Sequence, residues 1–492
     1  MKGRSSSTGP SFSELWLVWR RGAKCVSRVQ QRRTMITNLR FRNFKSWKSV
    51  DLDFAPLTGF FGPNSSGKSS LIQFLLMLKQ TKDSPDRSIV LDFGGPDSPC
   101  DLGAFSAAVH AHKTEEEIRW RLAWKTPDEI KIEDPSGKRS EVLFRGSDLA
   151  VLSAVKLQKD KLVSDFLEYD FAGNRFRLER RGSENGFRLQ VEPSTNFDFK
   201  RTLGRAWDLP GPIKSFAFPD QAKTYFQNSQ FLSEFETAYV RQMDSIIHLG
   251  PLREYPKRQY VWSGSSPIDV GSRGERTIDA ILAATGGKEK RNLRPRAKLL
   301  PFQEMIAYWL REMGLIEAFY VEEISVGSGL YRAKVKRDAA SPETLITDVG
   351  FGVSQILPVL VLLYYVPEKS TVILEQPEIH LHPAVQSALA DLIITAVKSR
   401  KIQVVLESHS EHLLQRLQRR IAEGADSPLP AIAPTDIKLY FCQTSKGSSH
   451  AETLALNLFG AIENWPKDFF GDQLDELAAR AEAAMKHSPE PA

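Results

Sequence analysis

The chain has 492 residues, of which 41% are hydrophobic and 26% charged, a composition typical of soluble globular proteins. Its formal net charge of +6 permits a nucleic-acid-binding face without requiring one. The three cysteines, Cys25, Cys100 and Cys442, fit no disulfide framework or metal-binding spacing. No apolar run approaches the ~18 residues that span a bilayer. We therefore expect a cytoplasmic protein that does not enter the membrane.

The first 34 residues differ from the rest of the chain. They are rich in Ser and Arg and carry no sustained core pattern, so we expect residues 1–34 to be a disordered or non-native N-terminal extension. Alternating apolar residues begin at Met35. We assign residues 35–110 to an N-terminal lobe, with predicted strands at 36–44, 50–54 and 57–61 and a helix at 69–80.

The middle of the chain is harder to interpret. Turn signals separate short apolar segments, and we expect residues 111–245 to form an inserted, strand-rich region. The predicted elements are strands at 118–124, 141–144, 176–180 and 187–191 and a helix within 229–247. No sustained heptads occur, so we expect no long coiled coil.

Alternating strand and helix patterns return after residue 245. We assign residues 246–415 to a C-terminal lobe and 416–492 to a small C-terminal region. The predicted strands lie at 321–326, 331–336, 371–374, 403–406 and 437–443, and the predicted helices at 353–365, 384–397 and 473–485.

The strongest motif follows the third predicted strand. It matches G-x-x-x-x-G-K-[ST], the loop whose backbone amides cradle phosphates ahead of a helix N-terminus. Lys68 is expected to reach the β- and γ-phosphates and Ser69 to ligate Mg²⁺. We therefore predict ATP and Mg²⁺ as cofactors. The predicted nucleotide-binding residues of the loop are Gly62, Pro63, Asn64, Ser65, Ser66, Gly67, Lys68, Ser69 and Ser70.

A second motif joins an apolar strand to acidic residues. The strand at 371–374 ends in Glu375, which suits a Walker B acid that holds Mg²⁺ through water. We therefore predict Ser69 and Glu375 as metal ligands. The following Gln376 is an amide and cannot act as a general base. Glu378 is the alternative base, and all three residues are catalytic candidates.

Two further segments add candidate residues. Before Glu375, a glycine pair opens a helix that carries Gly352, Ser354 and Gln355. This pattern suits a degenerate signature motif that binds nucleotide, although a plain helix start is the alternative. The strand at 403–406 precedes His409, which we predict to contact the γ-phosphate. Arg253 also follows an apolar stretch. It is expected either to contact the nucleotide or a partner subunit, or to form a surface salt bridge.

These blocks carry a resemblance to known families. Residues 39–80 resemble the start of RecF, OLD and SMC ATPases. Residues 350–355, 375–383 and 407–414 are similar to a bacterial subgroup of AAA-family ATPases with a short C-terminal domain of unknown function. The resemblance implies an ABC-type head that dimerises around two ATP molecules, and it raises antiphage defence as a context. Unlike OLD proteins, the chain shows no evident nuclease domain.

The expected fold class is thus α/β, a P-loop NTPase of ABC type with a strand-rich insertion. The leading hypothesis is an ATPase that hydrolyses slowly, forms a homodimer or higher oligomer through its ATP sites, and regulates an effector on another chain. A DNA-related or defence complex is the expected setting. The alternatives are a RecF-like, DNA-binding repair ATPase and a non-hydrolysing, ATP-gated scaffold, the latter favoured by Gln376.

Overall fold

The computed structural model describes most of the chain from Met35 onward. The described residues are 35–133, 142–182, 186–193, 197–204, 208–293, 297–427, 429–466, 469, 479–480 and 482–483. Residues 1–34 and most of the helix predicted at 473–485 lie outside this part. Within it, no helix has the length and apolar character needed to cross a membrane.

A six-stranded sheet forms the centre of the molecule, in the order β19-β18-β3-β17-β16-β9. All neighbours pair in parallel except β19, which pairs antiparallel with β18. The strands are β3 (Leu57–Phe61), β9 (Ile246–Leu249), β16 (Thr371–Glu375), β17 (Gln403–Glu407), β18 (Ile437–Ser445) and β19 (Ser448–Thr453). Because parallel strands end at a common edge, the segments after β3, β16 and β17 meet there.

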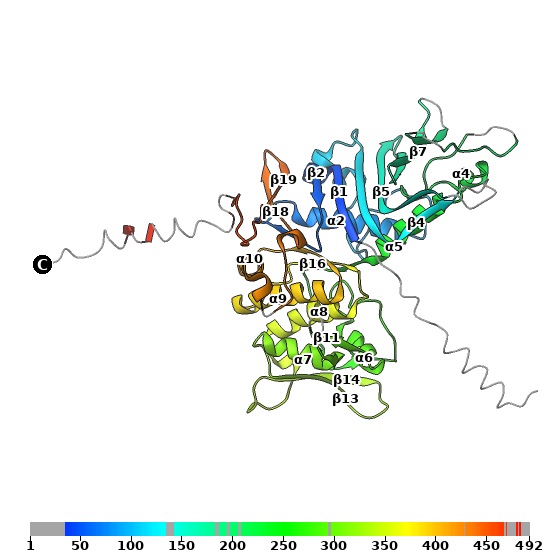
Figure 1. Ribbon diagram of the computed structural model, residues 1–492. Coiled ribbons are helices and arrows are strands. Elements are labelled where there is room, and N and C mark those ends of the chain that lie inside the picture. Colours follow the sequence, from blue (N-terminus) through cyan, green and yellow to red (C-terminus); the bar gives the residue numbers. More distant parts are fainter. Residues whose placement is uncertain are drawn as a thin grey trace, which may run out of the picture.

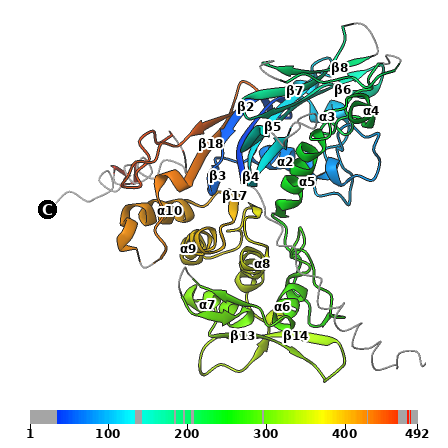
Figure 2. The same ribbon diagram turned by 45° about the vertical axis from the view of Figure 1, so that its right-hand side comes forward.

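Helices and a second sheet cover the two faces of this central sheet. Successive strand residues point to opposite faces: Ile373 and Val405 pack with α2 (Lys68–Asp83), whereas Val372 and Val404 pack with α8 (Phe351–Tyr365) and α9 (Pro383–Arg400). Figure 2 shows α2 on one side of the central sheet and α8 and α9 on the other. The near-continuous apolar runs of β16 and β17 reflect burial on both faces.

The strand-rich region continues the sheet that starts at residue 35. Seven antiparallel strands run in the order β2-β1-β4-β5-β6-β7-β8, so the hairpin of β1 and β2 and the later strands form one surface (Figure 1). Their bounds are β1 (Met35–Phe44), β2 (Trp47–Asp53), β4 (Ile118–Glu133), β5 (Val142–Gln158), β6 (Lys161–Phe171), β7 (Asn174–Arg180) and β8 (Phe187–Glu192). The helix predicted within 229–247 is α5 (Leu232–Ser245), preceded by α4 (Asp220–Tyr225).

Smaller elements complete the lobe on the α8 side. A sheet of β10 (Tyr260–Val261), β14 (Leu330–Lys336), β13 (Ala318–Glu323) and β15 (Thr344–Leu345) packs under α6 (Thr277–Gly286) and α7 (Phe302–Glu312). The remaining elements are α3 (Phe105–Ala108), β11 (Lys290–Asn292), β12 (Leu299–Pro301) and α10 (Glu411–Glu423). The predicted α/β class with a strand-rich region is confirmed, and no long coiled coil occurs in the described residues.

Candidate nucleotide-binding site

The loop between β3 and α2 adopts a backbone that requires glycine at two positions. Gly62 has φ +137°, and a Cβ there would lie 2.1 Å from the carbonyl oxygen of Cys442. Gly67 has φ +92°, and a Cβ there would lie 2.5 Å from the Ser449 hydroxyl. Only glycine combines these angles with such close neighbours. The tight loop places the first turn of α2 at the end of β3.

The loop and the ends of β16 and β17 border one open cavity of about 240 Å³. Its lining contains most of the residues predicted for the phosphate loop, together with side chains that follow the two neighbouring strands. The lining residues are Ser46, Asn64, Ser65, Ser66, Gly67, Lys68, Ser69, Ser70, Gln376, Glu407 and His409. Residues from three distant parts of the sequence therefore share one pocket.

Lys68 lies deep in this cavity, with 3% of its surface exposed. Its ammonium donates hydrogen bonds to the carbonyl oxygens of Gly62 at 3.1 Å and Pro63 at 2.8 Å. Burial lowers the pKa of Lys68, and the negative charge of Glu407 opposes this shift. Because its acceptors are neutral carbonyls, the charge of Lys68 is available to an anionic ligand.

The Ser69 hydroxyl donates a hydrogen bond to Oε1 of Glu407 at 3.0 Å. Glu407 is 2% exposed, and its Oε2 has no hydrogen-bond partner among the described residues. Burial, reinforced by the charge of Glu375, raises the pKa of Glu407 to about 7, while Lys68 opposes this shift. Sequence analysis did not single out Glu407, although an acid that ends an apolar strand just before His409 was a usable signal.

Glu375, the predicted Walker B acid, contacts residues on the β9 side of the central sheet. Its Oε1 lies 2.6 Å from Nε2 of His248, a residue of the neighbouring strand β9, and its backbone carbonyl accepts a hydrogen bond from Arg253 at 3.3 Å. Glu375 is absent from the described lining of the cavity. The structure pairs Ser69 with Glu407, so the assignment of Glu375 as a metal ligand stays a prediction.

Gln376 and Glu378, the two residues considered for water activation, make different contacts after β16. Gln376 has φ +43°, an uncommon backbone for this residue type, and its N–H donates to the Glu407 carbonyl at 2.9 Å. Gln376 lines the cavity. Glu378 instead accepts the N–H of His409 at 2.7 Å, and burial raises the pKa of its carboxyl. Glu378 therefore fixes the backbone of His409 and is not among the described residues that line the cavity.

His409 lines the cavity next to the phosphate loop. Burial lowers the pKa of its imidazole, and the positive charge of Lys68 lowers it further. A hydrogen bond with the Gly62 backbone raises this pKa and partly opposes the two effects. These effects favour a neutral imidazole near pH 7. A neutral ring can donate one hydrogen bond to a phosphate oxygen while its second nitrogen accepts one.

Arg253 is buried beside the end of β16, with 7% of its surface exposed. Its Nε and Nη1 have no hydrogen-bond partner among the described residues, and burial lowers the pKa of its guanidinium to about 10. The alternative of a surface salt bridge is therefore wrong.

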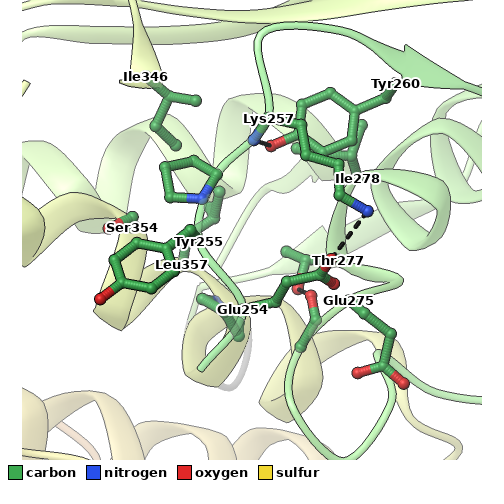
Figure 3. Close-up of a pocket in the computed structure, with 13 residues that line it drawn as sticks. Glu254, Tyr255, Lys257, Tyr260, Glu275, Thr277, Ile278, Ile346, Ser354 and Leu357 are labelled. Atoms are coloured by element: carbon green, nitrogen blue, oxygen red, sulfur yellow. Dashed lines mark hydrogen bonds and ion pairs between the residues drawn. The ribbon is translucent and has the colours of Figure 1, made fainter. Parts of the chain in front are cut away.

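The residues predicted for a signature motif lie at the N-terminal turn of α8, away from the cavity of their own chain. The Ser354 hydroxyl donates to the Phe351 carbonyl at 2.9 Å, and Ser354 and Gln355 are 8% and 7% exposed. Ser354 borders a small hollow of about 30 Å³ near Tyr255 and Leu357 (Figure 3). The roles of Gly352, Ser354 and Gln355 stay predictions.

The donor groups fit a magnesium ion that is carried by a nucleotide. No cluster of three or more His, Cys, Asp or Glu side chains suited to a metal occurs in the described residues. Mg²⁺ in nucleotide sites needs only one or two protein oxygens, because phosphate oxygens and water supply the rest. The hydroxyl of Ser69 and the half-unpartnered carboxylate of Glu407 provide such oxygens.

Three domain families match separate parts of the chain. The family described as "AAA ATPase domain" matches residues 35–164. The family described as "AAA domain, putative AbiEii toxin, Type IV TA system" matches residues 291–415. The family described as "Protein of unknown function (DUF3696)" matches residues 432–479. The first two matches contain the phosphate loop and the ends of β16 and β17.

Curated relatives include two proteins named DNA replication and repair protein RecF. The protein from Lactobacillus gasseri is 25% identical over 128 residues, 24% of this chain and 33% of that protein. The one from Lactobacillus johnsonii is 24% identical over the same extent. The chain thus spans about a third of the length of these relatives.

Solved structures with some likeness are SMC head domains. One is an SMC head bound to the C-winged helix domain of ScpA, at 12% identity and TM-score 0.39, with 86% of this chain and 98% of that chain covered. Another is the SMC head domain from Thermotoga maritima, at 11% identity and TM-score 0.35, with 85% and 99% covered. These scores are low, and the fold class rests on the strand order and the phosphate loop. Separate segments of the chain are thus similar to AAA ATPase domains, to RecF proteins and to the DUF3696 family, and the strand order and phosphate loop give the fold of a P-loop ATPase head.

Proposed function

We propose that this chain binds ATP with Mg²⁺ in the cavity at the end of β3, hydrolyses it slowly, and uses the bound state to regulate an effector on another chain. One observation carries the proposal. Lys68, Ser69, Gln376, Glu407 and His409 come from three distant segments and line the same cavity. Such convergence of a phosphate loop with polar strand ends is what phosphoryl transfer requires.

The chain's own groups divide the work of binding and hydrolysis. The backbone amides of the loop and the charge of Lys68 bind the β- and γ-phosphates. Ser69 and a carboxylate hold the nucleotide's Mg²⁺, which supplies countercharge when bound. Gln376 orients water by hydrogen bonding, and the neutral imidazole of His409 donates to the γ-phosphate. Glu378 fixes the backbone of His409 and so keeps that imidazole in place.

Slow hydrolysis follows from the residues that face the cavity. Among its described lining residues, Glu407 is the only acid, and it is engaged by Ser69. The amide of Gln376 cannot accept a proton from the attacking water. A general base contributes ~10²–10⁴-fold to rate, so an enzyme without one stays long in its ATP-bound form. A long-lived ATP state suits a regulatory switch.

The switch is proposed to act through assembly. In this arrangement two chains close around ATP, with Ser354 of one copy reaching the nucleotide of the other, and the closed dimer engages the effector. The similarity to RecF and to a family described with a toxin–antitoxin system supports a DNA-related or defence setting.

Lys68→Ala tests the nucleotide site directly. Removing the ammonium should weaken binding of a fluorescent ATP analogue by roughly 100-fold or more, because the β- and γ-phosphates lose their main countercharge. Lys48→Ala, at an exposed lysine on strand β2 of the seven-stranded sheet, is the matched control and should bind like the wild type. Equal affinity of the two variants would overturn the assignment.

A second candidate function is DNA binding, which the similarity to RecF favours. The purified protein should then bind duplex DNA with an affinity that falls steeply between roughly 50 and 200 mM salt. Binding that persists unchanged across this range, or no binding at all, would remove this candidate and leave the regulatory one.

A further inference from the structure

The Mg²⁺-binding carboxylate need not be the one that the linear motif indicates. β16 and β17 are parallel neighbours in which Glu375 lies opposite Glu407, so two acids end adjacent strands. β17 also pairs with β3, which leads into the phosphate loop, and Glu407 lies opposite Phe60 in that pairing. Glu375 is therefore one strand farther from the loop, a step of about 4.8 Å.

The contacts of the two carboxylates also place Glu407, and not Glu375, next to the phosphate loop. Glu407 accepts the hydroxyl hydrogen of Ser69 at 3.0 Å, and Ser69 is the loop residue expected to ligate Mg²⁺. Glu375 is engaged on its other side by His248, at 2.6 Å. The hydrogen bond to Ser69 places the Glu407 carboxylate beside the expected ion, whereas the contact with His248 directs Glu375 towards β9.

Glu407 also lacks the partners that a purely structural glutamate would have. Its Oε2 is buried and has no hydrogen-bond partner among the described residues. Leaving a charged oxygen buried and unpaired is costly, and a divalent cation removes that cost. Since Mg²⁺ binds through hard oxygen ligands, the free oxygen of Glu407 and the hydroxyl of Ser69 form a suitable pair.

We propose that Glu407, together with Ser69, binds the Mg²⁺ of the nucleotide, and that Glu375, held by His248, supports the site from the neighbouring strand. This inference rests on the proposed ATP-binding function. It gives the acid that ends β17 the metal-binding role that sequence analysis assigned to the acid that ends β16. The two metal ligands then follow or end the neighbouring strands β3 and β17, an arrangement that the order of motifs along the sequence does not reveal.

The test compares ATP binding with Mg²⁺ and with EDTA in the full-length protein, by equilibrium titration of a fluorescent ATP analogue. Glu407→Gln should keep metal-free binding and lose the gain in affinity that Mg²⁺ gives the wild type, by roughly 10-fold or more. Glu375→Gln should keep most of that gain. Glu115→Gln, at an exposed glutamate far along the chain, is the matched control.

A second variant separates charge from shape. Glu407→Asp keeps the carboxylate on a shorter side chain and should recover part of the Mg²⁺-dependent gain that Glu407→Gln loses. The inference is overturned if Glu407→Gln keeps the wild-type gain, or if Glu375→Gln loses as much as Glu407→Gln. A wild-type protein that binds no nucleotide under either condition would instead overturn the proposed function itself.

Discussion

At the scale of single residues, unsatisfied polar atoms concentrate around the end of β16. His248 Nδ1, Glu378 Oε2, Glu407 Oε2 and two guanidinium nitrogens of Arg253 are buried without a partner among the described residues. Each such group typically costs about 1–3 kcal/mol. A site that must receive a charged ligand keeps such groups unpaired in the free protein, and stability is lower there as a consequence.

The buried Glu407 carboxylate predicts a pH-dependent stability for the nucleotide-free protein. Burial raises its pKa to about 7 in the folded state from an ordinary value of 4.5, so between these values the folded state retains a proton that the unfolded state has released. Stability must therefore fall as pH rises through this window, by an amount on the order of 3 kcal/mol when complete. Glu407→Gln, which cannot ionise, should escape this loss.

Thermal unfolding with EDTA and no nucleotide measures the effect. Glu407→Gln should melt above the wild type at about pH 8, and the difference should shrink towards about pH 5. Stability of Glu407→Gln at or below the wild-type level at the higher pH would contradict the proposed burial of an ionisable, half-unpartnered group.

The rate of hydrolysis tests the roles of Gln376 and Glu378, which follow β16. Gln376→Glu adds an acid at a residue that lines the cavity. It should raise kcat by roughly 10-fold or more, since base assistance is worth ~10²–10⁴-fold. Glu378→Gln keeps an oxygen that can accept the His409 N–H, so kcat should change little. A large loss of kcat in Glu378→Gln, with ATP affinity unchanged, would identify Glu378 as the base.

At the scale of elements, the hairpin of β18 and β19, from the C-terminal region, forms hydrogen bonds with the phosphate loop and with Ser46. Thr444 donates to the Ser65 carbonyl at 3.1 Å, and the Ser449 hydroxyl donates to the Ser46 hydroxyl at 2.7 Å. Ser46 lines the nucleotide cavity. A segment that matches the DUF3696 family therefore contacts the loop of the proposed ATP site, which lies in the part of the chain that matches an AAA ATPase domain.

These hydrogen bonds predict that a hairpin residue affects nucleotide affinity. Ser449→Ala removes the partly buried hydrogen bond to Ser46, a change of about 0.5–1.5 kcal/mol, so ATP affinity should fall by roughly 2–10-fold. Ser448→Ala is the matched control, because the hydroxyl of Ser448 contacts His110 instead. Equal ATP affinities of the two variants, measured by titration, would show that the hairpin does not support the site.

Sequence patterns predicted where most helices and strands lie, but they did not predict which strands lie side by side in the sheet. The strands at β3, β16 and β17 and the helices α2, α8 and α9 follow from apolar runs and helical spacing. β6 was missed because charged residues such as Lys161, Asp165 and Glu168 interrupt its apolar pattern. Glu407 was missed for a different reason, since its role depends on β17 lying between β3 and β16. That order is set by packing between distant segments.

At the scale of the whole molecule, apolar side chains stand exposed beside the predicted signature residues. Leu252 and Tyr255 are each 71% exposed and Phe351 is 54% exposed, and the rings of Tyr255 and Phe351 meet edge to face at 5.7 Å. Clustered exposed aromatic residues are typical of interfaces. Their position at the start of α8 agrees with the proposal that a second copy closes over this face.

The proposed closure makes the oligomeric state depend on ATP and on this aromatic patch. The wild type should become dimeric with Mg²⁺ and ATP, and slow hydrolysis should keep the dimer long enough for light scattering after gel filtration. Phe351→Ser should weaken that dimer by roughly 30-fold, the effect of losing an aromatic hot spot worth ~2 kcal/mol. Val326→Ser, at a fully exposed apolar residue in the loop between β13 and β14, is the control and should dimerise like the wild type. The proposal is contradicted if the protein stays monomeric in ATP, or if Phe351→Ser dimerises as strongly as the control. Either result would mean that the N-terminal turn of α8 does not contact the nucleotide of a partner. Ser354 would then have only a structural role, as the residue whose hydroxyl donates to the Phe351 carbonyl.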